Sequence, residues 1–431
     1  MKFIKKYGRT LLCVVMERQV NALRKKHKFK VVAVVGSVGK TSTKLAIASV
    51  LSTSMIVRHQ EGNYNDRLTV PLVMFGHANP GLFNLFSWFK IILSNQRQIH
   101  GNYPYDVVVL ELGTDAPGQI AQFEYIKPNL SVITAATPEH MEFFGTVEAV
   151  AEEELAAAGF SDMTLVNIDD VPTGSLKNIG EFMSYGTVKN AEYRVELTAS
   201  NQGIPQQLKI ETPARKTYGA EINLLGSQGA KVALGAFSAA CEAGMDPAKA
   251  AEALSGLQAF SGRMRLLEGI KASTIIDDTY NASPAAVTAA LDVLYSFDAP
   301  QRIAILGTMN ELGETSETAH KDMGSYCDPK KLDLVITIGK EAEKYSAPAA
   351  QARGCKVVSF DSPYDAGQYA KEHLKSGAVV LAKGSQNRVF AEESLKSLLA
   401  NSSDEQKLVR QSEFWLKVKQ QQFPKKEGIK S

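Results

Sequence analysis

A short glycine-containing stretch near the front of the chain has residue types suited to holding a nucleoside triphosphate. The apolar run Val31 to Val35 leads directly into the loop GSVGKTS. Glycines let backbone N–H groups approach phosphate oxygens, and a helix expected from about Ser42 would direct its positive end toward them. We predict that Lys40 contacts the β and γ phosphates and that Thr41 binds Mg²⁺. The predicted nucleotide loop consists of Gly36, Ser37, Val38, Gly39, Lys40, Thr41 and Ser42.

Two further residues have positions that suit catalysis. Glu111 ends an apolar run, where a carboxylate is costly unless it faces a cation or an open site, so we predict that it binds Mg²⁺ beside Thr41. His140 follows a Thr-Pro turn after another such run. The alternatives are a solvent-facing Glu111, a structural His140 and an ordinary glycine turn at the loop, since Val34 replaces the first glycine of GxxxxGK[ST].

Short apolar runs separated by helix-like patterns would position these residues. The runs at 31–36, 106–111 and 130–135 are typical of parallel strands, so we expect the loop on an α/β sheet. Between about 165 and 225, alternating segments such as YRVEL and QLKIE predict an antiparallel β excursion, followed by alanine-rich helices from 229 to 256. A second, Rossmann-like unit is predicted beyond it. Its strands are expected at 273–277, 302–306, 333–338, 356–359 and 378–382.

Length and composition indicate a multidomain protein of the reducing cytoplasm. The chain has 431 residues, of which 44% are hydrophobic, enough for two or more cores. Its four cysteines lack CxxC spacing, which argues against a zinc site and a disulfide framework. Residues 1–30 carry ten Lys/Arg against one Glu, and residues 404–431 carry seven against four acids. The acidic middle that remains argues against a nucleic-acid partner.

Two apolar segments near the front have more than one interpretation. Ile4, Tyr7, Leu11 and Val14/Val15 recur at helical spacing among basic residues, which predicts an amphipathic helix. That helix could dock on the protein's own body or make a peripheral contact with an anionic membrane surface through residues 1–30. The aromatic stretch Leu82 to Leu93 is predicted as a buried helix, with a substrate lid or membrane contact as alternatives.

Ordered motifs along the chain resemble the Mur ligase family. They cover residues from about 30 to 398 and resemble most closely its D-alanyl-D-alanine-adding branch. Besides the loop, the motifs are EGNYNDRLTVPL (61–72), DVVVLELG (106–113), PEHMEFFGT (138–146), SGRM (261–264), IIDDTYNASP (275–284), ILGTMNELGE (305–314) and KGSQN (383–387).

This resemblance implies an ATP- and Mg²⁺-dependent ligase that phosphorylates a carboxylate and lets an amine capture the acyl phosphate. It implies that His140 holds a second metal and that Lys40, Glu111 and His140 are the catalytic residues. Glu154 stands where the family has a carbamoylated lysine, and we predict that it replaces that ligand. A solvated acidic helix turn is the alternative.

The same resemblance assigns the remaining site residues. Arg263 would swing onto the phosphates as the domains close, joined by the nucleotide-contacting residues Asp278, Tyr280 and Asn281. Asn63 and Asn65 remain from a substrate motif. Lys383, Gly384 and Ser385 would face the incoming amine, although an ordinary strand and turn is nearly as good an interpretation.

The implied domain organisation has four segments. They are a basic amphipathic helix (1–29), a central ATP-binding domain (30–260), a Rossmann-like C-terminal domain (261–402) and a basic tail (403–431). About thirty residues precede the loop, whereas the peptidoglycan ligases of the family have a UDP-sugar-binding domain there. We therefore expect that this domain is missing.

Departures from the family motifs leave three hypotheses open. Gln228, Val232, Thr308 and Arg67 occupy positions where the family has other residues. The chain could add D-alanyl-D-alanine to a peptidoglycan precursor peptide, or join a different carboxylate and amine, as in cofactor or polyglutamate synthesis. It could instead be a degenerate nucleotide-binding scaffold. The sequence does not indicate an oligomeric state.

Overall fold

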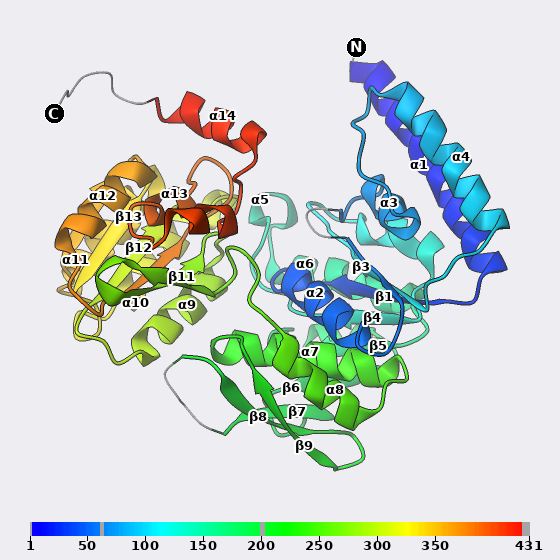
Figure 1. The fold of residues 1–431 in the computed structure, drawn as a ribbon, viewed down its shortest axis with the longest axis horizontal. Helices are drawn as coiled ribbons and strands as arrows, with labels where there is room; N and C mark the ends of the chain where they lie inside the picture. Colours follow the sequence, from blue (N-terminus) through cyan, green and yellow to red (C-terminus); the bar gives the residue numbers. More distant parts are fainter. Residues whose placement is uncertain (1, 61–63, 199–202, 425–431) are drawn as a thin grey trace.

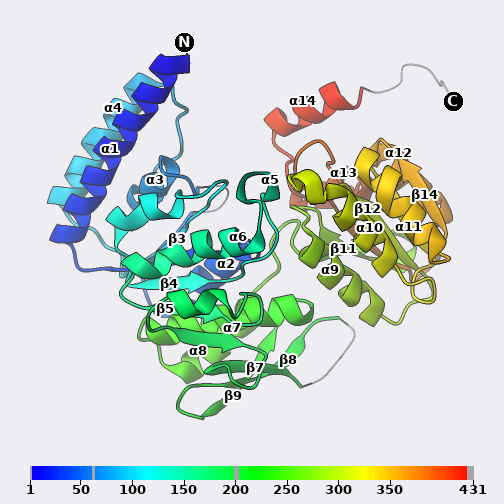
Figure 2. The same cartoon turned by 180° about the vertical axis from the view of Figure 1, so that it is seen from behind.

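A computed structural model describes residues 2–60, 64–198 and 203–424, and the side chains from residue 7 onward. The chain forms two lobes, each built on a mostly parallel sheet with helices on both faces (Figures 1 and 2). The α/β class and the two-sheet organisation predicted from the sequence are confirmed. No helix in the described ranges has the length and apolarity needed to cross a bilayer.

The first lobe contains a sheet with the strand order β2-β3-β1-β4-β5-β6-β7-β8-β9. The strands from β2 to β7 pair in parallel, and β7, β8 and β9 pair antiparallel. The strands are β1 (Lys30–Val35), β2 (Val57–Arg58), β3 (Val107–Glu111), β4 (Leu130–Ile133), β5 (Thr164–Asn167), β6 (Met183–Gly186), β7 (Tyr193–Leu197), β8 (Gln206–Glu211) and β9 (Thr217–Ile222).

Alternation along β1 divides the core of this lobe into two layers. Val32 and Val34 pack under α2 and α7, whereas Val31, Ala33 and Val35 pack on the opposite face, because successive strand residues point to opposite sides. Full burial on both faces explains the unbroken apolar run in the sequence. The helices of the body are α2 (Lys40–Leu51), α3 (Thr69–Phe75), α5 (Met141–Phe144), α6 (Val147–Leu155), α7 (Gly226–Glu242) and α8 (Pro247–Ala253).

Two long helices, α1 (Lys2–Lys26) and α4 (Leu85–His100), lie side by side and project from the first lobe (Figures 1 and 2). Cys13, Met16, Val20 and Leu23 are buried in the same apolar layer as Val31, so α1 docks on the protein's own body. The prediction that 82–93 is a buried helix is wrong for most of its aromatic residues. Trp88 is buried, but Phe83, Phe86 and Phe89 are exposed.

The second lobe contains a sheet with the order β10-β11-β15-β12-β13-β14, parallel except for β10. Its strands are β10 (Arg265–Gly269), β11 (Ser273–Asp278), β12 (Arg302–Gly307), β13 (Leu334–Ile338), β14 (Val357–Phe360) and β15 (Val379–Lys383). Its helices are α9 (Pro284–Ser296), α10 (Ser316–Tyr326), α11 (Ala347–Ala352), α12 (Pro363–His373), α13 (Glu392–Leu395) and α14 (Glu413–Gln422).

The strand predictions for both lobes agree with these bounds to within one or two residues, with two differences. The β excursion is not wholly antiparallel, because β5 and β6 extend the first sheet in parallel. The antiparallel strand β10 and the two-residue strand β2 were not predicted. The first sheet ends before residue 260 and the second begins at Arg265, while the four proposed domain boundaries stay predictions.

Helix α14 is held by a buried ion cluster. The Lys419 ammonium is fully buried and lies 2.9 Å from the Glu392 carboxylate and 2.6 Å from that of Glu393. Burial opposes ionisation of Glu393, but hydrogen bonds from Lys396 and Lys419 outweigh it and lower the pKa of Glu393. Helix α14, within the segment predicted as a basic tail, is therefore tied to the second lobe, and residues 425–431 lie outside the described part.

Candidate active site

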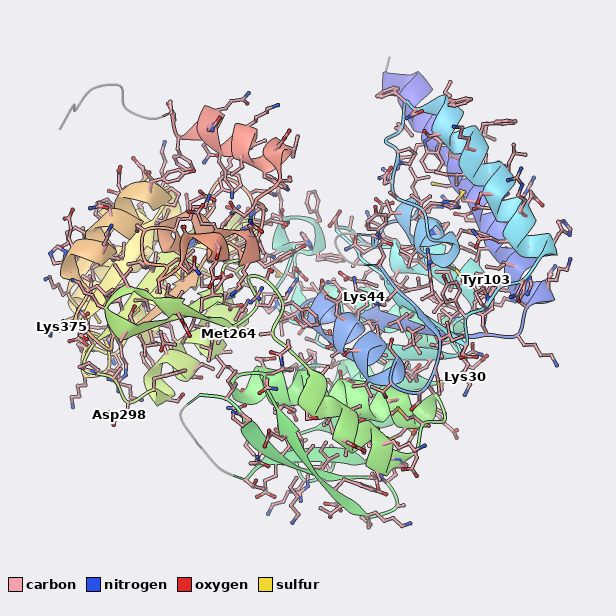
Figure 3. All side chains as sticks on the ribbon, viewed as in Figure 1. Lys30, Lys44, Tyr103, Met264, Asp298 and Lys375 are labelled. Atoms are coloured by element: carbon pink, nitrogen blue, oxygen red, sulfur yellow. The ribbon has the colours of Figure 1, made fainter. Side chains whose placement is uncertain are left out.

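A cavity of about 980 Å³ lies between the two lobes. Parallel strands present their carboxyl ends to it, as in other open α/β sheets. Lys44 on α2 and Met264 before β10 identify the two lobes in Figure 3. The predicted residues on its walls are Ser37, Val38, Gly39, Lys40, Thr41, Ser42, Asn65, Glu111, His140, Arg263, Asp278, Tyr280, Asn281 and Lys383.

The glycine loop has the geometry of an anion cradle. A Cβ atom on Gly36 would collide with Thr134 and with the backbone of Ala135, so only glycine fits there. Gly39 has φ 86°, a left-handed conformation, immediately before α2 begins at Lys40. The free N–H groups of the first turn of α2 therefore point toward the cavity.

Lys40 occupies the centre of this loop. Its ammonium donates to the carbonyl of Gly36 and lies 3.6 Å from the Glu139 carboxylate. Burial opposes the charge, but Glu139, Glu154 and Glu111 outweigh it and raise the pKa of Lys40. The ammonium therefore stays charged at neutral pH, as phosphate binding requires.

Glu111, at the end of β3, is buried beside Thr41. Its Oε1 accepts from the Thr41 hydroxyl at 3.2 Å and from the Asn65 amide at 3.5 Å. The buried ammonium of Lys44 lies 3.2 Å from Oε2, yet no described residue donates a hydrogen bond to that oxygen. Oε2 is paired with Lys44 but accepts no hydrogen bond from a described residue, so it keeps a lone pair for a second cation, which is the observation that supports a Mg²⁺ site here.

His140 lies where the two lobes meet. Its Nδ1 is 3.0 Å from the Glu311 carboxylate of the second lobe, and its Nε2 is 3.5 Å from Asp115. Burial opposes protonation, but the hydrogen bond with Glu311 and the nearby Glu139 and Asp115 raise the pKa of His140. The same contact lowers the pKa of Glu311. The imidazole thus bridges the lobes in this conformation.

Glu154 lies behind the loop and is absent from the cavity wall. Its carboxylate accepts from the Gly36 N–H at 2.9 Å and is almost completely buried. Burial raises its pKa to about 7, against the opposing effect of Lys40. The solvated acidic turn that was the alternative interpretation is thus excluded at this residue. Its role as a metal ligand stays a prediction.

The second lobe contributes cationic and aromatic groups. The Arg263 guanidinium stands 4.2 Å from the centre of the Tyr280 ring. The buried ammonium of Lys383 lies 2.6 Å from the Asp278 carboxylate and donates to the Asn281 carbonyl at 2.9 Å. Asp278 ends β11 and Lys383 ends β15. The two strands pair in parallel, and their register places these two residues opposite each other.

Some predicted residues lie away from the wall or outside the described part. Gly384 packs on Gly307, and the buried Ser385 hydroxyl accepts from the Asn310 N–H at 2.9 Å, so both support the loop behind Lys383. Gly36 lies at the base of the cradle. Asn63 lies outside the described residues.

Among the described residues, no group of three or more His, Cys, Asp or Glu side chains forms a ready metal cage. This is compatible with Mg²⁺, which keeps waters and takes few protein ligands beside phosphate oxygens. Thr41 and Glu111 are adjacent and fit such an ion. His140 and Glu154 are not brought onto a shared site with them in this conformation.

Comparison with known proteins gives the family. Residues 91–240 match the model of the Mur ligase middle domain, and residues 262–386 match that of the Mur ligase glutamate ligase domain. The chain belongs to the Mur ligase family. It is accordingly an ATP-dependent carbon–nitrogen ligase, as the sequence motifs predicted.

Two curated relatives carry the same name. The chain is 29% identical to "UDP-N-acetylmuramoyl-tripeptide--D-alanyl-D-alanine ligase" of Bacillus subtilis, covering 86% of this chain and 76% of the relative. It is 27% identical to the Escherichia coli protein of the same name, covering 74% and 66%. The fold resembles MurF of Thermotoga maritima "in complex with ADP", with a TM-score of 0.71, 22% identity and coverage of 92% and 84%.

Sequence reasoning missed several residues of the cavity and its surroundings. Lys44 lies one helical turn after Lys40, and that spacing could have placed it on the same face of α2. Glu311 lies within a quoted motif, but nothing local indicates that it reaches His140 in the other lobe. Arg9, Thr10 and Cys13 of α1 also line the cavity, and only the tertiary fold brings them there.

Proposed function

We propose that this ligase adds D-alanyl-D-alanine to the peptide of a peptidoglycan precursor in the cytoplasm. The observation that carries the proposal is the single cavity that joins the glycine loop and Glu111 of one lobe to Arg263, Asp278 and Lys383 of the other. The relatives with this name at 24–29% identity support the choice of substrates.

The reaction has two steps in this proposal. A carboxylate oxygen of the acceptor attacks the γ phosphorus of ATP, and the bond to the β-γ bridging oxygen breaks to release ADP. The amine then attacks the acyl carbon, phosphate leaves with the former carboxylate oxygen, and the ammonium proton is lost. Both steps move negative charge on oxygen, so charge stabilisation and positioning supply most of the catalysis.

The residues of the first lobe hold the phosphates. The loop N–H groups and Lys40 neutralise the β and γ oxygens, and Thr41 and Glu111 hold Mg²⁺. When bound, Mg²⁺ supplies Lewis-acid polarisation of the phosphoryl group. We propose that His140 orients a second metal or the acyl phosphate once the Glu311 contact opens, which keeps its predicted place in the site.

The residues of the second lobe complete the site as the lobes close. Arg263, resting on the half-buried Tyr280 ring, could leave it to reach the phosphates, because a cation–π contact contributes only about 0.5–2 kcal/mol. Asp278 fixes the Lys383 ammonium at the wall that we assign to the incoming amine, with Gly384 and Ser385 shaping its loop. Asn65 lies on the acceptor side beside Glu111.

Glu154 is proposed to replace the modified lysine of the family. Its buried carboxylate already contacts the loop at Gly36, and ligation would exchange that N–H for the metal. A Glu154→Gln variant with an unchanged Mg²⁺ requirement would exclude this role.

The test of the proposed function is phosphate release from ATP with UDP-N-acetylmuramoyl-tripeptide and D-alanyl-D-alanine, each alone and together. Turnover that requires both compounds supports the proposal, with Lys40→Ala as the blank. Turnover that requires another carboxylate and amine would replace these substrates and keep the ligase chemistry. Tight ATP binding without turnover for every pair would contradict the proposal and favour a scaffold.

A further inference from the structure

The projecting helix pair, α1 and α4, has an exposed apolar surface far from the cavity chemistry. We call it the helix-pair face. It consists of Tyr7, Leu11, Phe83, Leu85, Phe86, Phe89 and Leu93, each at least 44% exposed. Scattered single apolar residues on a surface are ordinary, but four on α4, with Phe83 just before it, form a group of the kind that marks an interaction site.

The spacing on α4 places its exposed apolar residues on one side of the helix. Phe86, Phe89 and Leu93 fall on one side of the helix at about 100° per residue, and the buried Trp88, Asn95 and Ile99 fall on the other. Residues 7 and 11 of α1 lie on one side of their helix in the same way. The two helices run in the same direction, since Met16 and Gln19 contact Asn95 and Lys26 contacts His100.

The inner side of the pair is firmly packed. The Asn95 amide donates to Gln19 Oε1 at 2.8 Å, and the Gln19 amide donates to the Ile92 carbonyl at 3.0 Å, so buried polar groups fix the pairing of the two helices. The Trp88 indole donates to the Gly81 carbonyl at 3.0 Å. The outward aromatic residues are therefore presented by a rigid support.

The charges around this face are mostly positive, and Asp66 nearby lies 3.5 Å from Arg9 of α1. Residues 67–105 contain no Asp or Glu, and the ten Lys/Arg of residues 1–30 accompany a single acid, Glu17. That acid is occupied by a bidentate contact with Arg67 at 2.5 and 3.1 Å. The ammonium of Lys90 stands 4.3 Å from the centre of the Phe86 ring, within the apolar patch itself. Aromatic and leucine side chains bordered by cations match the chemistry of an anionic lipid surface.

We propose that the helix-pair face docks on an anionic membrane surface. Phe86, Phe89 and Leu93 insert among the upper acyl chains while Lys90 and the basic residues of α1 contact the head groups. Arg9 and Cys13 lie on the side of α1 that lines the cavity, opposite Tyr7 and Leu11.

Vesicle co-sedimentation of the full chain tests this proposal. Vesicles of equal parts phosphatidylglycerol and phosphatidylcholine are compared with pure phosphatidylcholine, at low and high salt. We expect binding to the anionic vesicles alone, reduced by salt because the lipid charges are screened. Phe86→Ser/Phe89→Ser should weaken vesicle binding at least about tenfold, because two rings that would insert into the lipid are lost. Lys90→Glu should weaken vesicle binding as well.

The matched control is Phe414→Ser on α14, because Phe414 is 66% exposed and Phe86 is 68% exposed. That variant should bind vesicles as the parent protein does. All variants should keep their unfolding temperature and their ATP turnover in solution, because none touches the cavity wall.

Three results would overturn the docking proposal. They are the absence of binding by the parent protein, equal binding by the Phe86→Ser/Phe89→Ser variant, and a dimer in light scattering that this variant dissociates. The vesicle measurement needs no turnover, so failure of the proposed substrates and failure of membrane docking are distinguishable.

Discussion

Replacing Glu111 by Gln separates two roles that one carboxylate has in this structure. The buried ammonium of Lys44 lies 3.2 Å from Oε2 of Glu111. At an effective dielectric constant of about 20, two opposite charges at this distance attract each other by about 5 kcal/mol. After desolvation, removal of one member of a buried pair typically costs about 3–5 kcal/mol. We therefore expect Glu111→Gln to lower the free energy of unfolding by about that amount, measured by urea denaturation.

The same variant should also lose activity, because the Glu111 oxygen that accepts no hydrogen bond from a described residue is the proposed Mg²⁺ ligand. We expect kcat/KM for ATP to fall about 10²-fold or more, equivalent to about 2.7 kcal/mol. The Lys44→Met/Glu111→Gln double variant leaves no unpaired charge, so it should recover most of the stability while turnover stays low. A single variant with parental stability and parental turnover would refute the reasoning on both points.

Other predictions concern the second lobe. Lys419→Ala should lower the free energy of unfolding by about 3–5 kcal/mol, because it leaves buried carboxylates unpaired. The exposed Lys417→Ala should change it by less than about 0.5 kcal/mol. Thermal unfolding of both variants measures the difference. The pKa of Glu393 is lower in the folded protein than its ordinary value of 4.5, so the ionised carboxylate stabilises the fold at pH values above 4.5, and this contribution is lost as the pH falls through the lowered pKa. Proteolysis of α14 should therefore accelerate below pH 4.5. A proteolysis rate that is independent of pH would contradict the ion cluster. Arg263→Ala should lower kcat/KM for ATP about 10²-fold, with the exposed Arg353→Ala as a control at the parental value; equal kinetics for both would remove Arg263 from the site.

The sequence predicted the fold well where local pattern and burial agree. The run of β1 is apolar on both faces because helices cover both sides of that strand, and such runs are readable without a structure. The strand-end position of Glu111 and the glycine loop were readable for the same reason, since strand ends in parallel sheets face a common edge.

Contacts between distant segments could not be predicted in this way. The pair of His140 and Glu311 depends on how two lobes meet, and the burial of Ser385 depends on a loop that packs from elsewhere. The aromatic residues of α4 show a further limit, because a helix with two apolar sides does not reveal which side is buried. Only the partner helix α1 decides that Trp88 is inside and Phe86 outside.

In the proposed reaction, the cavity between the lobes activates a carboxylate as an acyl phosphate for capture by an amine. The most direct measurement uses UDP-N-acetylmuramoyl-tripeptide with ¹⁸O in the reacting carboxylate, together with ATP, Mg²⁺ and D-alanyl-D-alanine. Phosphorus NMR of the released phosphate should show one ¹⁸O atom per molecule, with no signal from Lys40→Ala. Amide product accompanied by unlabelled phosphate would contradict the account.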